Sequence, residues 1–203
     1  MMGDGFVDVK CHYDLLIDEE NDPVRDPDPL RAYMDRWDGQ TFLEALGLTG
    51  REAVLEIGVG TGRLAQRVIP LCGHFTGIDL SPKTIARAEE NLGHSEKTLL
   101  ICGDFLDYAS EKIFDVIYCS LTMMHFPDKM RFLRKVSSLL RKGGLFAVSL
   151  DKSREPWIDM GTRKIQIYPD DPAQTAAYIR AVGMTVTASW DTEAAWILIC
   201  RKD

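Results

Sequence analysis

Alternation between short apolar runs and segments of helical periodicity is the feature that most constrains the fold of this chain. From residue 53 onward, apolar runs predict strands over 53–59, 74–79, 98–102, 114–120, 145–150, 184–190 and 195–200. Helices are expected between them, over 64–71, from Ser81 to Gly93, from Asp128 to Gly143, and over 172–182. This alternation predicts an α/β fold, a doubly wound and mostly parallel sheet with helices on both faces.

The length of 203 residues predicts one domain spanning 1–203. Two segments stand outside the alternating pattern. Residues 1–50 are expected to form an N-terminal helical cover, and the polar, aromatic-containing residues 151–171 form an insertion expected near an acceptor pocket.

The charge balance favours small molecules as partners. The chain has 24 Lys and Arg against 31 Asp and Glu, a net charge of −7, which disfavours nucleic acid and anionic membranes. No apolar run approaches the roughly 20 residues that span a bilayer, and no signal-peptide pattern begins the chain. The five cysteines form no CxxC pair, so we expect reduced, buried thiols and a cytoplasmic protein. The oligomeric state stays open.

A glycine-rich turn follows the first predicted strand. Gly58, Gly60 and Gly62 form a GxGxG pattern, and such glycines let the backbone approach a ligand beside a helix N-terminus. The dinucleotide pattern is GxGxxG, and Arg63 occupies the position of its last glycine, so NAD is disfavoured. A nucleotide-like ligand is expected, and a tight strand-to-helix connection without a ligand is the alternative.

Acidic residues end the next two strands. Asp79 follows Gly58 by 21 positions, where a carboxylate can accept hydrogen bonds from both ribose hydroxyls. Asp104 could accept from an exocyclic amino group, and Phe105 offers an apolar edge to a base. The alternatives are a helix cap at Asp79 and an ordinary turn at Asp104.

His125 is the candidate catalytic residue, because it follows the fourth strand of the pattern at the edge where an acceptor would lie. A histidine of near-neutral pKa could accept a proton from a nitrogen or oxygen nucleophile. The alternative is a histidine that packs in the loop or caps the next helix. No histidine spacing suggests a metal site. The candidate acceptor-binding residues are Tyr13, Tyr33, Trp37, Trp157 and Arg163.

These patterns together resemble the class I, Rossmann-like S-adenosylmethionine-dependent methyltransferases of the small-molecule type. The resemblance covers roughly residues 50–203 and depends on VLEIGVGTGRLA (54–65), GIDLS (77–81), GDF (103–105), FDVIYCSLTMMHF (114–126) and LLRKGGLFAVSLD (139–151). Two positions depart from the family pattern. Val59 replaces a Cys or small polar residue, and Met124 replaces the first of two histidines.

The resemblance implies a seven-stranded sheet of order 3-2-1-4-5-7-6 with its last strand antiparallel. It implies S-adenosylmethionine as the cofactor and a small molecule as the methyl acceptor. The glycine loop would approach the methionine end of the cofactor, Asp79 the ribose and Asp104 the adenine. The cofactor-binding residues would be Glu56, Gly58, Gly60, Gly62, Asp79, Leu80, Gly103, Asp104, Phe105 and Ser120.

Three other functions stay open at this point. A protein with this crevice could bind the cofactor without transferring a methyl group, or could methylate nucleic acid or protein. A third possibility is aminopropyl transfer, which would favour acidic side chains near residues 120–125, and that loop contains none. A basic stripe lies on the predicted helix that begins near Asp128, and we interpret it as a solvated face.

Overall fold

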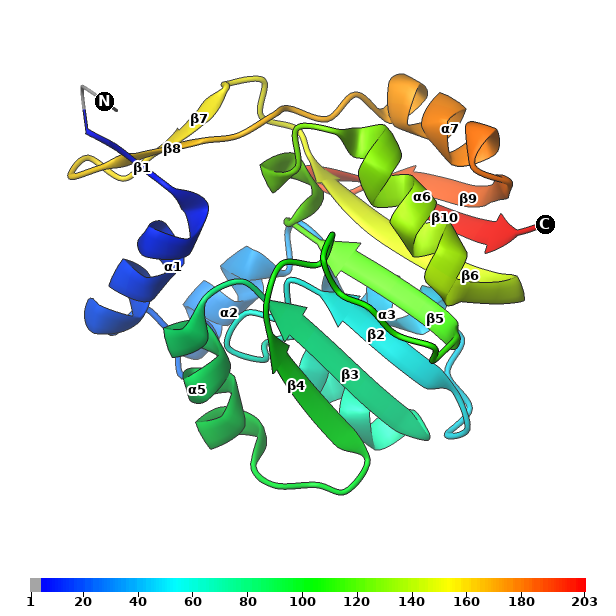
Figure 1. Cartoon of the computed structure of the whole chain (residues 1–203). Helices are drawn as coiled ribbons and strands as arrows, with labels where there is room; N and C mark the ends of the chain where they lie inside the picture. The colour runs from blue at the N-terminus through cyan, green and yellow to red at the C-terminus, as the bar shows by residue number, and fades with distance from the viewer. Residues whose placement is uncertain (1–4) are drawn as a thin grey trace.

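The structure, a computed structural model, describes residues 5–203, so residues 1–4 of the predicted domain lie outside it. Its centre is a seven-stranded sheet of order β4-β3-β2-β5-β6-β10-β9 (Figure 1). The first five strands pair in parallel, and β10 is antiparallel to both of its neighbours. The predicted fold class and strand order are confirmed. The strands are β2 (Ala53–Ile57), β3 (His74–Asp79), β4 (Thr98–Cys102), β5 (Phe114–Ser120), β6 (Leu140–Asp151), β9 (Met184–Asp191) and β10 (Ala195–Lys202).

Side chains of the central strand β5 alternate between the two faces of the sheet. Val116 and Tyr118 belong to one buried apolar cluster, and Ile117 and Cys119 belong to another. A strand buried on both faces reads as a continuous apolar run, which is the pattern that predicted a strand over 114–120.

Helices cover both clusters. The first cluster packs under α3 (Gly39–Ala45), α4 (Ala65–Val68) and α5 (Pro82–Leu92), and the second under α6 (Lys129–Leu139) and α7 (Pro172–Ala181). Ser81 caps α5 by accepting a hydrogen bond from the Thr84 N–H, as predicted. The predicted basic stripe is solvent-facing, but it does not lie on one helix: Arg131 and Arg134 are exposed and Lys135 is partly buried on α6, whereas the exposed Arg141 and Lys142 belong to β6.

Several element boundaries differ from the prediction, three of them for a clear structural reason. β2 ends at Ile57 because Gly58 turns the chain with a φ of 77°. The helix expected over 64–71 becomes the short α4 and a 3-10 turn (Ile69–Leu71), because Pro70 has no N–H to continue the helical hydrogen bonds. The helix expected to reach Gly143 ends at Leu139, and β6 begins at once through an irregular register against β5.

The N-terminal segment and the insertion form a second, three-stranded sheet of order β1-β8-β7. Its strands are β1 (Phe6–Val7), β7 (Trp157–Asp159) and β8 (Lys164–Gln166). The hairpin expected in the insertion is present as the antiparallel pair β7 and β8, and β1 adds an unpredicted parallel strand. The N-terminal cover is otherwise helical, with α1 (Val9–Asp18) and α2 (Asp28–Met34) before α3. Figure 1 shows this small sheet beside α1.

The first four parallel strands end at Ile57, Asp79, Cys102 and Ser120. Carboxyl ends of parallel strands meet at one edge of a sheet, where α/β folds bind ligands. Among the described residues, no helix is long and apolar enough to cross a membrane.

Candidate functional site

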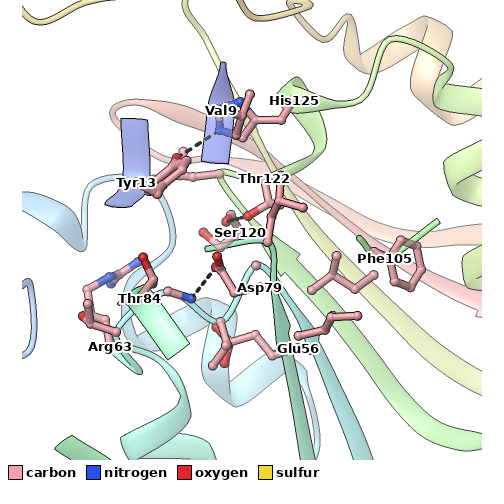
Figure 2. Close-up of a pocket in the computed structure, with 18 of the residues that line it drawn as sticks. Val9, Tyr13, Glu56, Arg63, Asp79, Thr84, Phe105, Ser120, Thr122 and His125 are labelled. Atoms are coloured by element: carbon pink, nitrogen blue, oxygen red, sulfur yellow. Dashed lines mark hydrogen bonds between the residues drawn. The ribbon is translucent and has the colours of Figure 1, made fainter. Parts of the chain in front are cut away.

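A cavity of about 480 Å³ lies at the carboxyl ends of the strands (Figure 2), within the usual range of small-molecule sites. Nine of the ten predicted cofactor-binding residues line it, all but Gly62. Their binding roles stay predictions. Those that line the cavity are Glu56, Gly58, Gly60, Asp79, Leu80, Gly103, Asp104, Phe105 and Ser120, together with the candidate catalytic residue His125 and, from the candidate acceptor-binding residues, Tyr13.

The glycine loop is shaped by a close approach to the loop after β5. A Cβ on Gly58 would lie 2.0 Å from the Thr122 hydroxyl oxygen, so only glycine fits there. The Gly58 and Val59 N–H groups both donate to the Ile78 carbonyl, which ties the turn to β3. A Cβ on Gly60 would meet no atom within 4 Å, so open space lies beside that backbone.

Asp79 joins the glycine loop to the next helix. Its Oδ2 accepts from the Gly60 N–H at 3.0 Å, and its Oδ1 accepts from the Ser81 N–H at 3.0 Å. Burial raises the pKa of the Asp79 carboxyl above its usual value, against the lowering effect of these hydrogen bonds. Asp79 therefore shapes the turn before α5 and also faces the cavity, so both interpretations from the sequence describe part of its environment.

Asp104 and Phe105 line the cavity and also make contacts that stabilise the protein around it. Asp104 lines the cavity, and its Oδ1 accepts from the Leu106 N–H at 2.8 Å, which is a turn interaction. The Phe105 ring is buried and packs at a centroid distance of 5.3 Å from Phe132 of α6. These contacts fix the wall of the cavity that the base of a nucleotide-like ligand would face.

Glu56 is a buried carboxyl on the floor of the cavity. It is 3% exposed, and its Oε2 accepts from the Tyr118 hydroxyl at 2.7 Å. Burial raises the pKa of Glu56 to about 8, although the Tyr118 hydrogen bond and the charge of Arg63 oppose that shift.

An ion pair between Arg63 and Asp38 braces the same wall, and the sequence analysis missed it as a site feature. The Asp38 carboxylate accepts from the Arg63 guanidinium, from the Ser120 hydroxyl at 2.7 Å and from the Gly39 N–H at 2.6 Å. Arg63 lines the cavity. In the sequence it was informative only because it occupies the position of the last glycine of the GxGxxG pattern. Asp38 belongs to no recognisable motif. The sequence hint at this position is that Gly39 follows it, an arrangement consistent with its place as the residue before α3.

His125 and Tyr13 meet across the cavity (Figure 2). The Tyr13 hydroxyl lies 3.0 Å from His125 Nε2, and His125 Nδ1 is buried without a hydrogen-bond partner. Burial, with a smaller effect from the charges of His12 and Lys129, lowers the pKa of His125 to about 4. The expected near-neutral pKa is therefore corrected, and His125 is uncharged at neutral pH. Burial also raises the pKa of Tyr13 well above its usual range, so the pair is neutral.

Four of the five predicted acceptor-binding residues do not line the cavity. The Trp37 indole N–H donates to Asp151 Oδ2 at 2.6 Å, and Tyr33 is exposed and packs edge-on against Trp37. Trp157 packs edge-on against Phe6 on the small sheet. Arg163 donates to His12 of α1 and to Glu19, the residue directly after α1.

Gly62 also lies away from the cavity. A Cβ there would lie 3.0 Å from the Leu92 side chain, so this glycine serves packing between the loop and α5. In the part of the chain that the structure describes, no group of three or more His, Cys, Asp and Glu side chains could hold a metal ion.

Comparison with known proteins places these features in a family. The family model described as "Methyltransferase domain" matches residues 55–148. The chain is 35% identical over 131 residues to an uncharacterized methyltransferase of Anoxybacillus flavithermus, covering 62% of this chain and 60% of that protein. It is 34% identical over 98 residues to malonyl-[acyl-carrier protein] O-methyltransferase 1 of Ilyobacter polytropus, covering 47% of this chain and 37% of that protein. The chain therefore spans less than two thirds of each of these relatives.

Solved structures share the whole fold. Magnesium protoporphyrin IX methyltransferase of Synechocystis, crystallised with bound SAM, superposes with a TM-score of 0.75 at 16% identity, covering 96% of this chain and 95% of that one. Residues 55–148 match the methyltransferase domain, and the strand order and this likeness show that the chain has the fold of the class I, Rossmann-like S-adenosylmethionine-dependent methyltransferases.

Proposed function

We propose that this protein transfers the methyl group of S-adenosylmethionine to a small, uncharged and largely apolar acceptor. The observation that carries this proposal is the position of Asp79, whose carboxylate lies 3.0 Å from the Gly60 N–H inside the cavity. A carboxylate beside a glycine loop, at the ends of two adjacent parallel strands, is suited to a ribose next to an amino-acid moiety.

The cavity walls fit such a cofactor. Gly60 and Gly103 line the cavity, and a Cβ at either position would meet no atom within 4 Å, so open space reaches both backbones. Asp79 would hold the ribose hydroxyls, and Asp104 and Phe105 would face the adenine. The carboxylate of Asp79 also attracts a cationic ligand, whereas Glu56, with a pKa of about 8, is mostly uncharged at neutral pH.

The remaining lining favours an uncharged acceptor. It is mostly apolar, from Val9, Leu16, Ile17, Met34, Phe126 and Pro127 among others. Among the described lining residues, Arg63 is the one cation, and it is paired with Asp38. The polar groups opposite the cofactor loop, Tyr13 and His125, are neutral at pH 7. An anionic acceptor would therefore find no free positive charge beside the Asp79 carboxylate.

The cofactor supplies an electrophilic methyl group on a sulfonium, which needs alignment with the acceptor more than activation. The chain's own contribution is to exclude water with the apolar wall and to orient the acceptor. The Tyr13–His125 pair can hydrogen bond to an acceptor hydroxyl or amine, and its neutral imidazole can accept a proton.

Calorimetry with S-adenosylmethionine, S-adenosylhomocysteine and NAD tests the cofactor. We expect micromolar binding of S-adenosylhomocysteine, on the order of −7 to −8 kcal/mol, and no comparable binding of NAD. Tight NAD binding, or no binding of S-adenosylhomocysteine, would contradict the proposal.

Transfer of labelled methyl groups into a metabolite extract then separates an enzyme from a protein that only binds the cofactor. Extract fractions divided by charge test the acceptor class. We expect the labelled product in the neutral, organic-extractable fraction, and labelling confined to anionic metabolites would contradict an uncharged acceptor.

A further inference from the structure

Arg163 is a buried cation in the insertion, and the cofactor cavity does not use it directly. It is 7% exposed, and it sits immediately before β8. Its two terminal nitrogens donate to the two carboxylate oxygens of Glu19 at 2.6 and 2.8 Å, and its Nε donates to His12 Nδ1 at 2.9 Å. All three of these hydrogen bonds lead to α1 or to the residue that ends it.

The two contacts fix α1 in different ways. Glu19 is the residue directly after α1, so the bidentate pair holds the C-terminal end of the helix. His12 lies within α1, is 3% exposed and accepts from Arg163, which fixes the rotation of the helix about its axis. The other end of α1 is held by β1, whose Phe6 and Val7 pair with Lys164 and Ile165 of β8. The insertion therefore holds α1 at both ends.

α1 forms one wall of the cavity. Val9, Leu16 and Ile17 line it, and Tyr13 reaches the Nε2 atom of His125 at 3.0 Å. Across the helix, Asp14 accepts from the Ser81 hydroxyl at 2.7 Å, close to Asp79. A helix of 10 residues has little stability of its own, so its position depends on such tertiary contacts.

We propose that Arg163 is a positioning residue, which locks α1 over the cavity through Glu19 and His12 and so places Tyr13 against His125. Arg163 touches neither of those two residues, and its effect reaches them through the orientation of the helix. His12 and Tyr13 are neighbours in the chain, so a rotation of α1 that released His12 would also withdraw Tyr13 from the cavity.

The proposal is tested first without any ligand. In the Arg163→Met variant we expect amide hydrogen exchange in α1 to become at least tenfold faster, with exchange in α6 unchanged. With ¹³C-labelled histidine, we expect the pKa of His125 to rise by at least one unit from about 4, because release of α1 exposes the imidazole to water. A general loss of stability would accelerate exchange in α6 as well and would leave the pKa of His125 in the folded protein unchanged.

The second readout rests on the proposed function and uses S-adenosylhomocysteine as the probe. We expect its dissociation from Arg163→Met to be at least tenfold faster than from the unaltered protein. Arg163→Lys keeps the charge but replaces the three donor nitrogens of the planar guanidinium with a single ammonium, which cannot reach both Glu19 oxygens and His12, so its dissociation rate should fall between the two. Arg154→Met is the matched control, because Arg154 lies on the same insertion and contacts the Asp170 carbonyl, the Asp171 carboxylate and the Trp196 ring, none of which belongs to α1. We expect it to change nothing.

Glu19→Gln weakens the bidentate pair between Arg163 and Glu19 from the side of α1. If Arg163→Met does not fold, the same measurements on Glu19→Gln test the proposal. The double variant should be no worse than Arg163→Met alone, because Arg163→Met already breaks the contact with Glu19 as well as the one with His12. Unchanged α1 exchange and an unchanged His125 pKa in the folded variants would overturn the proposal. If the unaltered protein fails to bind S-adenosylhomocysteine, the proposed function fails, and the exchange and histidine measurements still decide the role of Arg163.

Discussion

Replacing Gly58 with Ala is the most direct test of how the glycine loop is built. The φ of Gly58 is 77°, a left-handed conformation that costs an alanine about 1–2 kcal/mol. The added Cβ would also lie 2.0 Å from Thr122 Oγ1 and 2.8 Å from Thr122 Cβ, so this loop must move. Overpacking of this kind costs roughly 1–3 kcal/mol, so we expect a total loss of about 2–5 kcal/mol in the free energy of unfolding.

Gly60→Ala is the matched control for this substitution. Its φ is 57°, so the backbone strain is similar, but its Cβ would meet no atom within 4 Å. We therefore expect Gly60→Ala to lose only about 1–2 kcal/mol, the backbone contribution alone. Urea unfolding of both variants measures the difference. Thr122→Ala should restore part of the loss in Gly58→Ala, because it removes the two closest atoms. Equal losses in the two glycine variants would refute the role of Thr122.

Three further substitutions test the rest of the site. Asp79→Ala should weaken S-adenosylhomocysteine binding by roughly 2–4 kcal/mol in calorimetry, because it removes charge-assisted hydrogen bonds to the ribose; unaltered affinity would make Asp79 only a turn residue. Asp38→Ala should lower the free energy of unfolding by up to about 3–5 kcal/mol in urea, since it leaves the largely buried Arg63 with only the longer contact to Asp35 at 3.4 Å, and a loss below about 1 kcal/mol would contradict the pairing with Asp38. The pKa of His125 is about 4 in the folded protein and near 6.5 when unfolded, so the unfolded state binds the extra proton between these values. As the pH falls from 6.5 to 4, the free energy of unfolding should therefore fall by roughly 1–3 kcal/mol more in the unaltered protein than in His125→Gln. If the two proteins show parallel dependence of this free energy on pH, His125 is not buried in its neutral form.

The positions of the cofactor-loop residues follow from local sequence pattern. Gly58 and Asp79 each end a buried strand, and the order of strands in an α/β fold brings such ends to one edge. The sequence could therefore predict that they share a site before any contact was known. The Ser81 cap of α5 was equally local, because its partner Thr84 lies three residues away.

Residues outside the alternating pattern were harder to predict. Trp157 and Arg163 were expected in the acceptor pocket, because aromatic and cationic side chains in an insertion suggest ligand contacts. Arg163 instead binds Glu19 and His12, more than 140 residues away in the chain. No local pattern distinguishes a cation that binds a ligand from one that binds a distant carboxylate.

The sequence by itself determined the α/β fold, the strand order through its family resemblance, and the edge of the sheet at which the site lies. These properties follow from hydrophobic periodicity and from glycines and carboxylates at strand ends, all of which act over a few residues. Only the tertiary structure decided that β1 pairs with the insertion, that Asp38 pairs with Arg63, and that His125 is buried with its Nε2 beside the Tyr13 hydroxyl. Those outcomes depend on which distant side chains come into contact and on how much water the contact excludes. Exclusion of water from His125 is the main cause of its lowered pKa.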